Sequence, residues 1–211
     1  MASKETKSRI LAAAVSLFNE KGMVNVRLQH ISDFTIISLG NITYHFKTKD
    51  DIVLAIWDTI KEEQKQLLAE FKTLPLFEDI DRYIQAQFLL QRKYLFFYLD
   101  MLEVVRAYPE ISKLHRKHII WQESQLINVF NFNIARGAFL KFEESQYKIL
   151  AENWMALSES WLSRQNIKGE DKSNYKSYNL SMWSLLRPYM TEIGNAEFEQ
   201  LTNLRQLIAY E

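Results

Sequence analysis

The amino-acid sequence predicts an all-α fold, on three observations. Of 211 residues only 5 are Gly and 3 are Pro, too few for the many tight turns of an all-β protein. Apolar residues make up 47% of the chain, which suffices for a core without covalent cross-links. Along most of the chain these residues recur at spacings of three and four, the period of an amphipathic helix.

Periodicity and capping residues place the helices in order. The first helix ends at Gly22, where a left-handed C-cap is favoured. Two short helices follow and need packing by their neighbours. Thr48 and Asp51 have capping-box spacing at the start of a long helix, and Gly194-Asn195 is expected to split the last two helices. The predicted ranges are 3–21, 28–34, 38–44, 48–71, 80–98, 110–134, 143–165, 178–190 and 197–210.

Composition excludes several classes of function. The chain has no Cys, which excludes disulfides, thiol catalysis and cysteine metal sites. Neither glycine-rich phosphate-binding pattern occurs, and no Ser-His-Asp or lysine nucleophile arrangement stands out. No run approaches the roughly 18 apolar residues of a membrane helix, and the N-terminus lacks the apolar core of a signal peptide. We therefore expect a soluble, cytoplasmic protein that is not an enzyme and needs no cofactor.

Two histidines are the nearest approach to a metal site. His115 and His118 are three residues apart and share one face of a predicted helix. No Cys, and no carboxylate at ligand spacing, accompanies them. We interpret them as part of an ordinary polar helix face beside Arg116 and Lys117, and we expect no metal site.

Basic residues are concentrated near the N-terminus. The whole chain has 26 Lys plus Arg and 26 Asp plus Glu, so its net charge is zero. Up to position 49, seven basic residues stand against three acidic ones. The basic ones are Lys4, Lys7, Arg9, Lys21, Arg27, Lys47 and Lys49. A basic segment on a neutral protein is the electrostatic footprint of a nucleic-acid-binding module.

The N-terminal helices have the order of a helix-turn-helix motif, whose second short helix enters a major groove with its first residues against the base edges. Here Ser38 can cap that helix, Gly40 allows close approach of the backbone, and Asn41 can read an adenine edge. Leu39 predicts an apolar contact such as a thymine methyl, or no base contact. Ile42 is the predicted buried anchor.

Two runs of sequence resemble the TetR family. They are ILAAAVSLFNEKG at 10–22 and ISLGNITYHFKTKDDI at 37–52, and the resemblance covers about residues 4–60. It implies a homodimeric DNA-binding transcription factor, usually a repressor, that reads a pseudo-palindromic operator and is released by a small effector. It also implies a helix-turn-helix three-helix DNA-binding domain at 1–50, followed by a larger helical dimerisation and effector-binding domain at 51–211.

The resemblance assigns roles to individual residues. The implied DNA-binding residues are Arg27, Gln29, Ser38, Leu39, Gly40, Asn41, Thr43, Tyr44, His45, Lys47 and Lys49. Those at 38–41 fall at the base-facing start of the recognition helix, and the others fall at phosphate contacts. Thr43 replaces a tyrosine that is common in the family.

The turn between the two short helices departs from the family pattern. Thr35-Ile36 stands where Ala-Gly is usual, and Phe34 stands where a polar residue is usual. A β-branched residue in a left-handed turn is strained by on the order of 1 kcal/mol. We therefore expect a re-shaped turn. The departure leaves one alternative open, a helical small-molecule or protein-binding module whose DNA face has decayed.

The C-terminal aromatic residues allow two interpretations. The heptad-like stripe is Tyr147, Leu150, Trp154, Leu157 and Trp161. The resemblance implies a dimeric four-helix bundle built by about 143–165 and 178–190, so the stripe faces either that interface or the subunit core. The candidate lining of an effector cavity is Tyr94, Phe97, Tyr98, Trp121 and Phe130. The expected effector is a small apolar or aromatic molecule, although aromatics at helical spacing are more often plain core.

Overall fold

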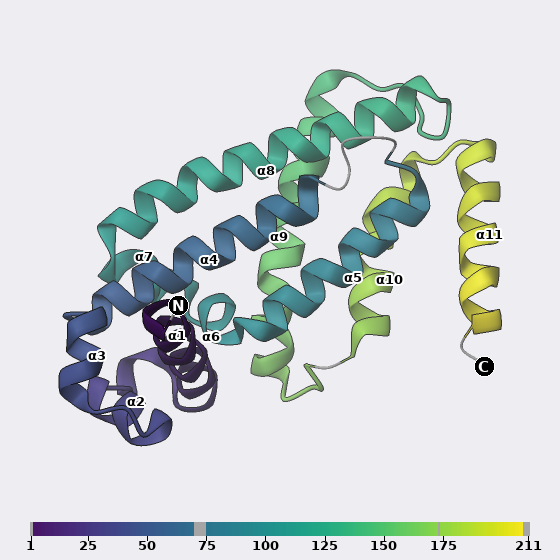
Figure 1. Ribbon diagram of the computed structural model, residues 1–211. Coiled ribbons are helices and arrows are strands. Elements are labelled where there is room, and N and C mark those ends of the chain that lie inside the picture. The colour runs from purple at the N-terminus through teal and green to yellow at the C-terminus, as the bar shows by residue number, and fades with distance from the viewer. Residues whose placement is uncertain (1, 70–74, 173, 209–211) are drawn as a thin grey trace. The chain divides into compact units, whose positions relative to one another are not determined.

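The computed structural model describes residues 2–69, 75–172 and 174–208, and over these residues the predicted all-α fold is confirmed (Figure 1). The chain divides into two compact units. Unit 1 comprises Met1–Glu63 and Leu90–Leu114, and unit 2 comprises Gln64–Leu89 and His115–Glu211. In the described part of the chain, no helix combines the length and the apolar character needed to cross a membrane.

Unit 1 contains the helix-turn-helix and its supporting helices. Its elements are α1 (Ala2–Lys21), the 3-10 turn η1 (Met23–Asn25), α2 (Leu28–Thr35), α3 (Leu39–His45), the first part of α4 (Lys49–Ala69), the end of α5 (Phe77–Lys93), α6 (Leu95–Leu99), α7 (Met101–Ala107) and the start of α8 (Pro109–Ala135). Two aromatic pairs mark its core. Phe18 of α1 meets Phe96 edge-on with ring centroids 5.1 Å apart, and Trp57 of α4 stacks on Phe97 at 5.3 Å.

Unit 2 contains the remaining parts of α4, α5 and α8 together with the C-terminal helices. These are α9 (Glu144–Lys168), α10 (Tyr175–Leu186), the 3-10 turn η3 (Arg187–Tyr189) and α11 (Glu192–Ile208). An aromatic cluster joins α5, α9 and α10, because the ring of Phe88 lies within 6 Å of the rings of Trp161 and Tyr178. Next to it, the hydroxyl groups of Ser158 and Tyr178 are hydrogen-bonded at 2.8 Å.

The single helix predicted over 80–98 is wrong, because the chain leaves the helical conformation at Tyr94, with φ −111° and ψ 43°. The Asn19 side chain of α1 bonds to both sides of this break. Its Nδ2 donates to the carbonyl oxygen of Lys93 at 2.9 Å, and its Oδ1 accepts from the Phe96 N–H at 2.9 Å. A contact with a distant helix thus replaces a turn that periodicity alone favoured.

Gly194 does not split two helices as predicted, since α11 begins at Glu192 and includes it. A Cβ at this position would overlap the carbonyl oxygen of Ala138. Thr191, just before the helix, donates from Oγ1 to the carbonyl oxygen of Gly137 at 2.7 Å. The glycine therefore allows two segments to pack closely. The predicted helix ends at 71 and 210 lie outside the described residues.

The capping box at the start of α4 is confirmed. The Thr48 N–H donates to Asp51 Oδ2 at 2.9 Å, and the Asp51 N–H donates to Thr48 Oγ1 at 3.2 Å. These reciprocal bonds satisfy two backbone donors that the helix itself leaves open. They fix the point at which the chain turns from α3 into α4.

Candidate nucleic-acid interface

The turn between α2 and α3 keeps the left-handed conformation, so the expectation of a re-shaped turn is wrong. Ile36 has φ 57° and ψ 30°, and its side chain is 93% exposed. Thr35 holds the chain on either side of it. Its Oγ1 donates to the carbonyl oxygen of Ile31 at 2.7 Å and accepts from the Ile37 N–H at 3.4 Å. The structure therefore keeps the unfavourable left-handed backbone conformation at Ile36.

Two further side chains fix this turn. The buried Ser32 donates from Oγ to the carbonyl oxygen of Ile37 at 2.7 Å. Arg9 of α1 donates from Nη2 to the carbonyl oxygen of Thr35 at 3.2 Å. One member of the basic N-terminal segment, Arg9, therefore supports the turn. These bonds determine the local backbone well enough to tolerate one strained residue.

The start of α3 presents its residues to solvent. Ser38 is the N-cap, and its Oγ accepts from the Asn41 N–H at 3.3 Å. The side chains of Leu39 and Asn41 are exposed, and a Cβ built on Gly40 would have no protein atom within 4 Å. Ile42 on the opposite face is fully buried. Both the predicted cap and the predicted anchor are confirmed.

The second half of α3 carries the predicted phosphate-binding hydroxyls. The ring of Tyr44 is 82% exposed and meets the ring of His45 edge-on, with centroids 5.2 Å apart. Thr43 is half-buried and donates from Oγ1 to the carbonyl oxygen of Gly40 at 3.1 Å. Tyr44 is thus open to solvent, whereas the proton of the Thr43 hydroxyl is used within the helix.

At the start of α2, Arg27 and Gln29 are both exposed. Gln29 donates from Nε2 to Asp33 Oδ1 at 2.7 Å, one helical turn away. The backbone N–H of Arg27 donates to Nδ1 of His30 at 3.1 Å. His30 therefore caps the helix, which is a structural role that the sequence did not suggest.

Two lysines lie next to Thr48 at the start of α4 and differ in their surroundings. Lys47 is exposed, whereas Lys49 is half-buried and donates from Nζ to the carbonyl oxygen of Met23 at 3.1 Å. An ammonium group has three donors, so this bond leaves two. Close by, Asp50 accepts a hydrogen bond from Tyr108; burial first, and then the charge of Asp50, raise the pKa of that phenol to about 12.

The five aromatic residues predicted to line an effector cavity are divided between the units. In unit 1, Tyr94 donates from its hydroxyl to Glu63 Oε1 at 2.9 Å, and Phe97 lies between the rings of Trp57 and Tyr98. All three predicted residues of this unit are buried. Their contacts account for them as core.

The other two aromatic residues belong to unit 2. Phe130 is buried, with ring centroids 6.2 Å from Phe139 and 5.9 Å from Tyr147. Trp121 stacks on His118 and borders a pocket of about 260 Å³. The pocket is lined by Lys65, Gln66, Leu68, Ala69, Trp121 and Gln125.

His115 and His118 are buried, so their prediction as an ordinary polar face is wrong. A signal for this was present in the sequence, because the apolar Ile111 and Leu126 lie on the same face of α8. Gln122, on that face too, was not singled out at all. Among the described residues, no three His, Asp or Glu side chains come together as a metal site.

The α9 stripe packs inside the subunit, which is the second of its two predicted interpretations. Tyr147, Leu150, Trp154 and Trp161 are buried, and Leu157 is half-buried.

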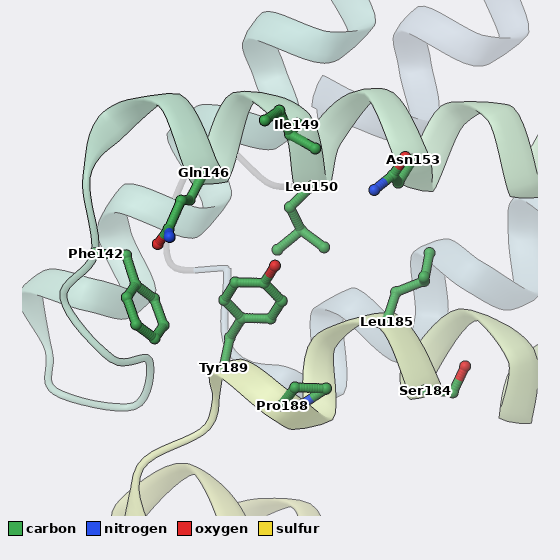
Figure 2. Close-up of a pocket in the computed structure, with 9 residues that line it drawn as sticks. All are labelled: Phe142, Gln146, Ile149, Leu150, Asn153, Ser184, Leu185, Pro188 and Tyr189. Carbon is green, nitrogen blue, oxygen red and sulfur yellow. The ribbon is translucent and has the colours of Figure 1, made fainter.

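A different face of α9 is open to solvent and borders a groove of about 480 Å³ (Figure 2). Figure 2 shows Leu185 and Tyr189 extending from the end of α10 and η3 towards α9. Ile149 on the α9 side is 54% exposed. The groove is lined by Phe142, Gln146, Ile149, Leu150, Asn153, Ser184, Leu185, Pro188 and Tyr189.

Comparisons with known proteins extend over most of the chain. Residues 10–56 match a family model described as bacterial regulatory proteins of the tetR family, and residues 60–198 match one described as bacterial transcriptional repressor. The HTH-type transcriptional regulator QacR of Staphylococcus aureus is 26% identical over 133 residues, which is 57% of this chain and 71% of that protein. The regulator AcrR of Shigella flexneri is 30% identical over 70 residues, 33% of each chain.

Solved structures share the fold. A TetR-family regulator from Marinobacter aquaeolei superposes with a TM-score of 0.85 at 23% identity, over 92% of this chain and 96% of that one. A regulator from Saccharomonospora viridis, solved in complex with choline, gives 0.74 at 23% identity, over 90% and 99%. The exposed α3, the fold and the two family matches lead to one conclusion: the chain belongs to the TetR family and is a DNA-binding transcriptional regulator.

Proposed function

We propose that this regulator binds a pseudo-palindromic operator as a homodimer, represses transcription there, and is released by a small molecule bound in unit 2. One observation carries the proposal. The N-cap and the first residues of α3, at 38–41, are exposed, whereas Ile42 behind them is fully buried. A major groove admits an α-helix in this presentation.

We assign the base contacts to three neighbouring residues at the start of α3. The Asn41 amide has the donor and acceptor needed for the N6 and N7 atoms of adenine. Leu39 offers an apolar surface to a thymine methyl group. Gly40 between them has open space in the direction of a Cβ, which lets the helix backbone approach the bases closely.

We assign the main phosphate contacts to the exposed side chains around α3. Arg27 at the start of α2, Tyr44 in α3 and Lys47 before α4 are all exposed. His45, packed against Tyr44, lies beside them. Positive charge on this surface attracts the DNA backbone and releases counterions, so affinity falls as salt rises.

Three other predicted contacts are already bonded within the protein. Lys49 is bonded to a backbone carbonyl, Gln29 to a carboxylate and Thr43 to its own helix. Lys49 keeps two donors for a phosphate. Gln29 and Thr43 must exchange an internal bond for a DNA contact, so we assign them the smaller contributions.

The proposed dimer forms through the exposed faces of α9 and α10. Ile149 and Ile167 of α9 and Leu180 of α10 are each more than half exposed. The groove in Figure 2 lies beside Ile149. In a two-fold dimer both subunits use the same surface, so the apolar patch of each subunit is buried by that of the other. Such a dimer presents two α3 helices to two half-sites.

Binding of a small molecule is supported by the S. viridis regulator, whose fold this chain shares and which was solved in complex with choline. We place the corresponding site in unit 2. The aromatic cluster around Phe88 provides an apolar interior of the kind that small-molecule sites use.

The experiment that tests the proposal is selection of bound duplexes from a random DNA pool at two salt concentrations. We expect an enriched site with two-fold symmetry, and binding that falls steeply with salt. The molar mass of the free protein, measured by light scattering, is expected to be that of a dimer. An Ile149→Asp/Leu180→Asp variant should be a monomer.

Three outcomes contradict parts of this proposal. Failure to enrich any duplex even at low salt favours the alternative of a helical binding module with a decayed DNA face. An enriched site without two-fold symmetry contradicts the dimeric reading while keeping α3 as the reading helix. A monomeric wild-type protein contradicts the role of α9 and α10.

A further inference from the structure

Buried amides in unit 2 differ in whether the protein satisfies them. Asn133 of α8 donates from Nδ2 to the carbonyl oxygens of Pro75 and Val129 at 3.0 and 2.8 Å, and its Oδ1 accepts from Arg136 at 2.8 Å. Three helical turns earlier, Gln122 is 0% exposed as well. Neither its Nε2 nor its Oε1 has a hydrogen-bond partner among the described residues.

A second amide in unit 2 is incompletely satisfied. Gln87 of α5 is 2% exposed, and its Oε1 has no partner among the described residues. A buried polar group without a partner destabilises the folded state, and native proteins contain few of them. Two such amides in one unit, beside a satisfied one, require a specific explanation.

Gln122 lies on a stretch of α8 whose buried face is polar. One turn before it, His118 donates from Nε2 to Gln64 Oε1 of α4 at 2.7 Å. His115 precedes by one more turn, and burial lowers its pKa to about 4, so its ring is neutral at pH 7. The hydrogen-bonding groups on this buried face of α8 are therefore uncharged at pH 7.

The most deeply buried polar side chains of the described residues are uncharged. Where the structure describes burial, the polar side chains below 9% exposure are amides, imidazoles and hydroxyls, and none belongs to Asp, Glu, Lys or Arg. An anionic ligand among them would lack an ionic partner, and a cationic one would depend on Glu159 of α9, whose burial raises its pKa to about 7 and so weakens its charge at that pH. An uncharged ligand with a donor and an acceptor satisfies an amide without that penalty.

We propose that Gln122 is the hydrogen-bonding anchor of the effector site in unit 2, and that it takes an uncharged ligand with an apolar body and an amide-like donor and acceptor. This inference rests on the proposed function of unit 2 and deepens it by naming a residue and a ligand class. The rival occupant is a structural water, which needs two to four polar partners.

The test measures thermal unfolding with probes of one size and different charge. The probes are benzamide, benzoate and benzylammonium, each at about 10 mM. A ligand with a Kd of about 1 mM raises the Tm of a chain of this size by about 3–6 °C at that concentration. We expect benzamide to raise the wild-type Tm and the two charged probes to leave it unchanged.

The decisive variant is Gln122→Leu, which replaces the amide by an apolar side chain of similar size. It should raise the Tm of the free protein, because an unsatisfied polar group is removed, and abolish the rise with benzamide. The matched control is Asn131→Leu on the same helix, where the amide side chain is exposed to solvent. This control should keep the benzamide response.

Three results would overturn the inference. They are an unchanged wild-type Tm with benzamide, a Gln122→Leu variant that keeps the benzamide response, and a Gln122→Leu variant with a lowered Tm. A response to benzylammonium alone would overturn the ligand class and direct attention to Glu159, the half-buried acid of α9. Because the test needs no DNA, its result is independent of whether the duplex selection succeeds.

Discussion

The helix-turn-helix of unit 1 and the interior of unit 2 use their polar side chains differently. In the helix-turn-helix, Ser32 and Thr35 bond to backbone groups no more than five residues away. In unit 2, Asn179 donates to Asp81, 98 residues earlier in the chain. The first arrangement is encoded by a short stretch of sequence, whereas the second depends on the fold that brings distant segments together.

The largest expected effect on stability comes from a contact between distant segments of unit 2. Gly194→Ala places a methyl group against the backbone of Ala138, which is unable to move as a flexible side chain would. We expect the free energy of unfolding to fall by about 2–3 kcal/mol, measured by urea denaturation. The matched control is Gly40→Ala in α3, where a Cβ meets open space. Equal stability of the two alanine variants would contradict the close packing at Gly194.

A second long-range effect depends on pH. Burial, and then the charge of Glu123, raise the pKa of Glu159 from 4.5 to about 7. Between these values the folded protein holds a proton that the unfolded chain has released, so stability falls as pH rises through this window. Glu159→Gln should therefore stabilise the protein by about 2 kcal/mol at pH 8 and leave it unchanged at pH 4.

The control for this pH dependence is Glu152→Gln, which changes an exposed acid on the same helix. Thermal unfolding from pH 4 to 8 compares the two variants with the wild-type protein. A parallel pH profile for wild-type and Glu159→Gln proteins would show that the carboxyl group is adequately solvated.

The same distinction explains what the sequence could predict. The Ser38 cap and the buried Ile42 follow from residue type and spacing within one turn, and the structure confirms both. The helix break at Tyr94 depends on a side chain of α1, and the role of Gly194 depends on a distant carbonyl oxygen. The burial of Gln122 depends on three-dimensional packing in the same way. The assignment of individual DNA contacts stays a prediction.

Within unit 1, mutations of base-reading residues and of phosphate-binding residues should have different effects on DNA binding. Asn41→Ala should reduce discrimination at one base position by roughly 1–3 kcal/mol, because the amide is the expected partner of an adenine. Lys47→Ala should weaken binding to all sequences alike and reduce the salt slope by about 1. Titration of a set of single-base operator variants at several salt concentrations measures both. An equal loss on every variant for Asn41→Ala would contradict its role as a base reader.

Gly40 tests whether the backbone of α3 approaches the DNA closely. The alanine variant gains helix propensity, so we expect it to be more stable than wild type by about 0.5–1 kcal/mol. It should nevertheless bind the operator about tenfold more weakly, because the added methyl group occupies the space towards the bases. Retention of full affinity would place the backbone of α3 farther from the bases.

The smallest expected effect concerns the strained turn. Ile36 is 93% exposed, so its side chain contributes little burial, yet its left-handed backbone is unfavourable for a β-branched residue. Ile36→Gly removes that strain but adds freedom to the unfolded chain, and the balance should stabilise the protein by about 0.5 kcal/mol. Ile36→Asn should also stabilise it, since Asn tolerates this conformation, whereas Ile36→Val should give no gain.

Operator affinity measured on these three variants completes the test. We expect it to be unchanged, because the bonds from Ser32, Thr35 and Arg9 hold the turn whichever residue occupies position 36. A loss of affinity in Ile36→Gly and Ile36→Asn, despite their higher stability, would mean that the exposed isoleucine itself contacts the DNA. The strain would then belong to recognition, and the turn would join α3 as part of the reading surface.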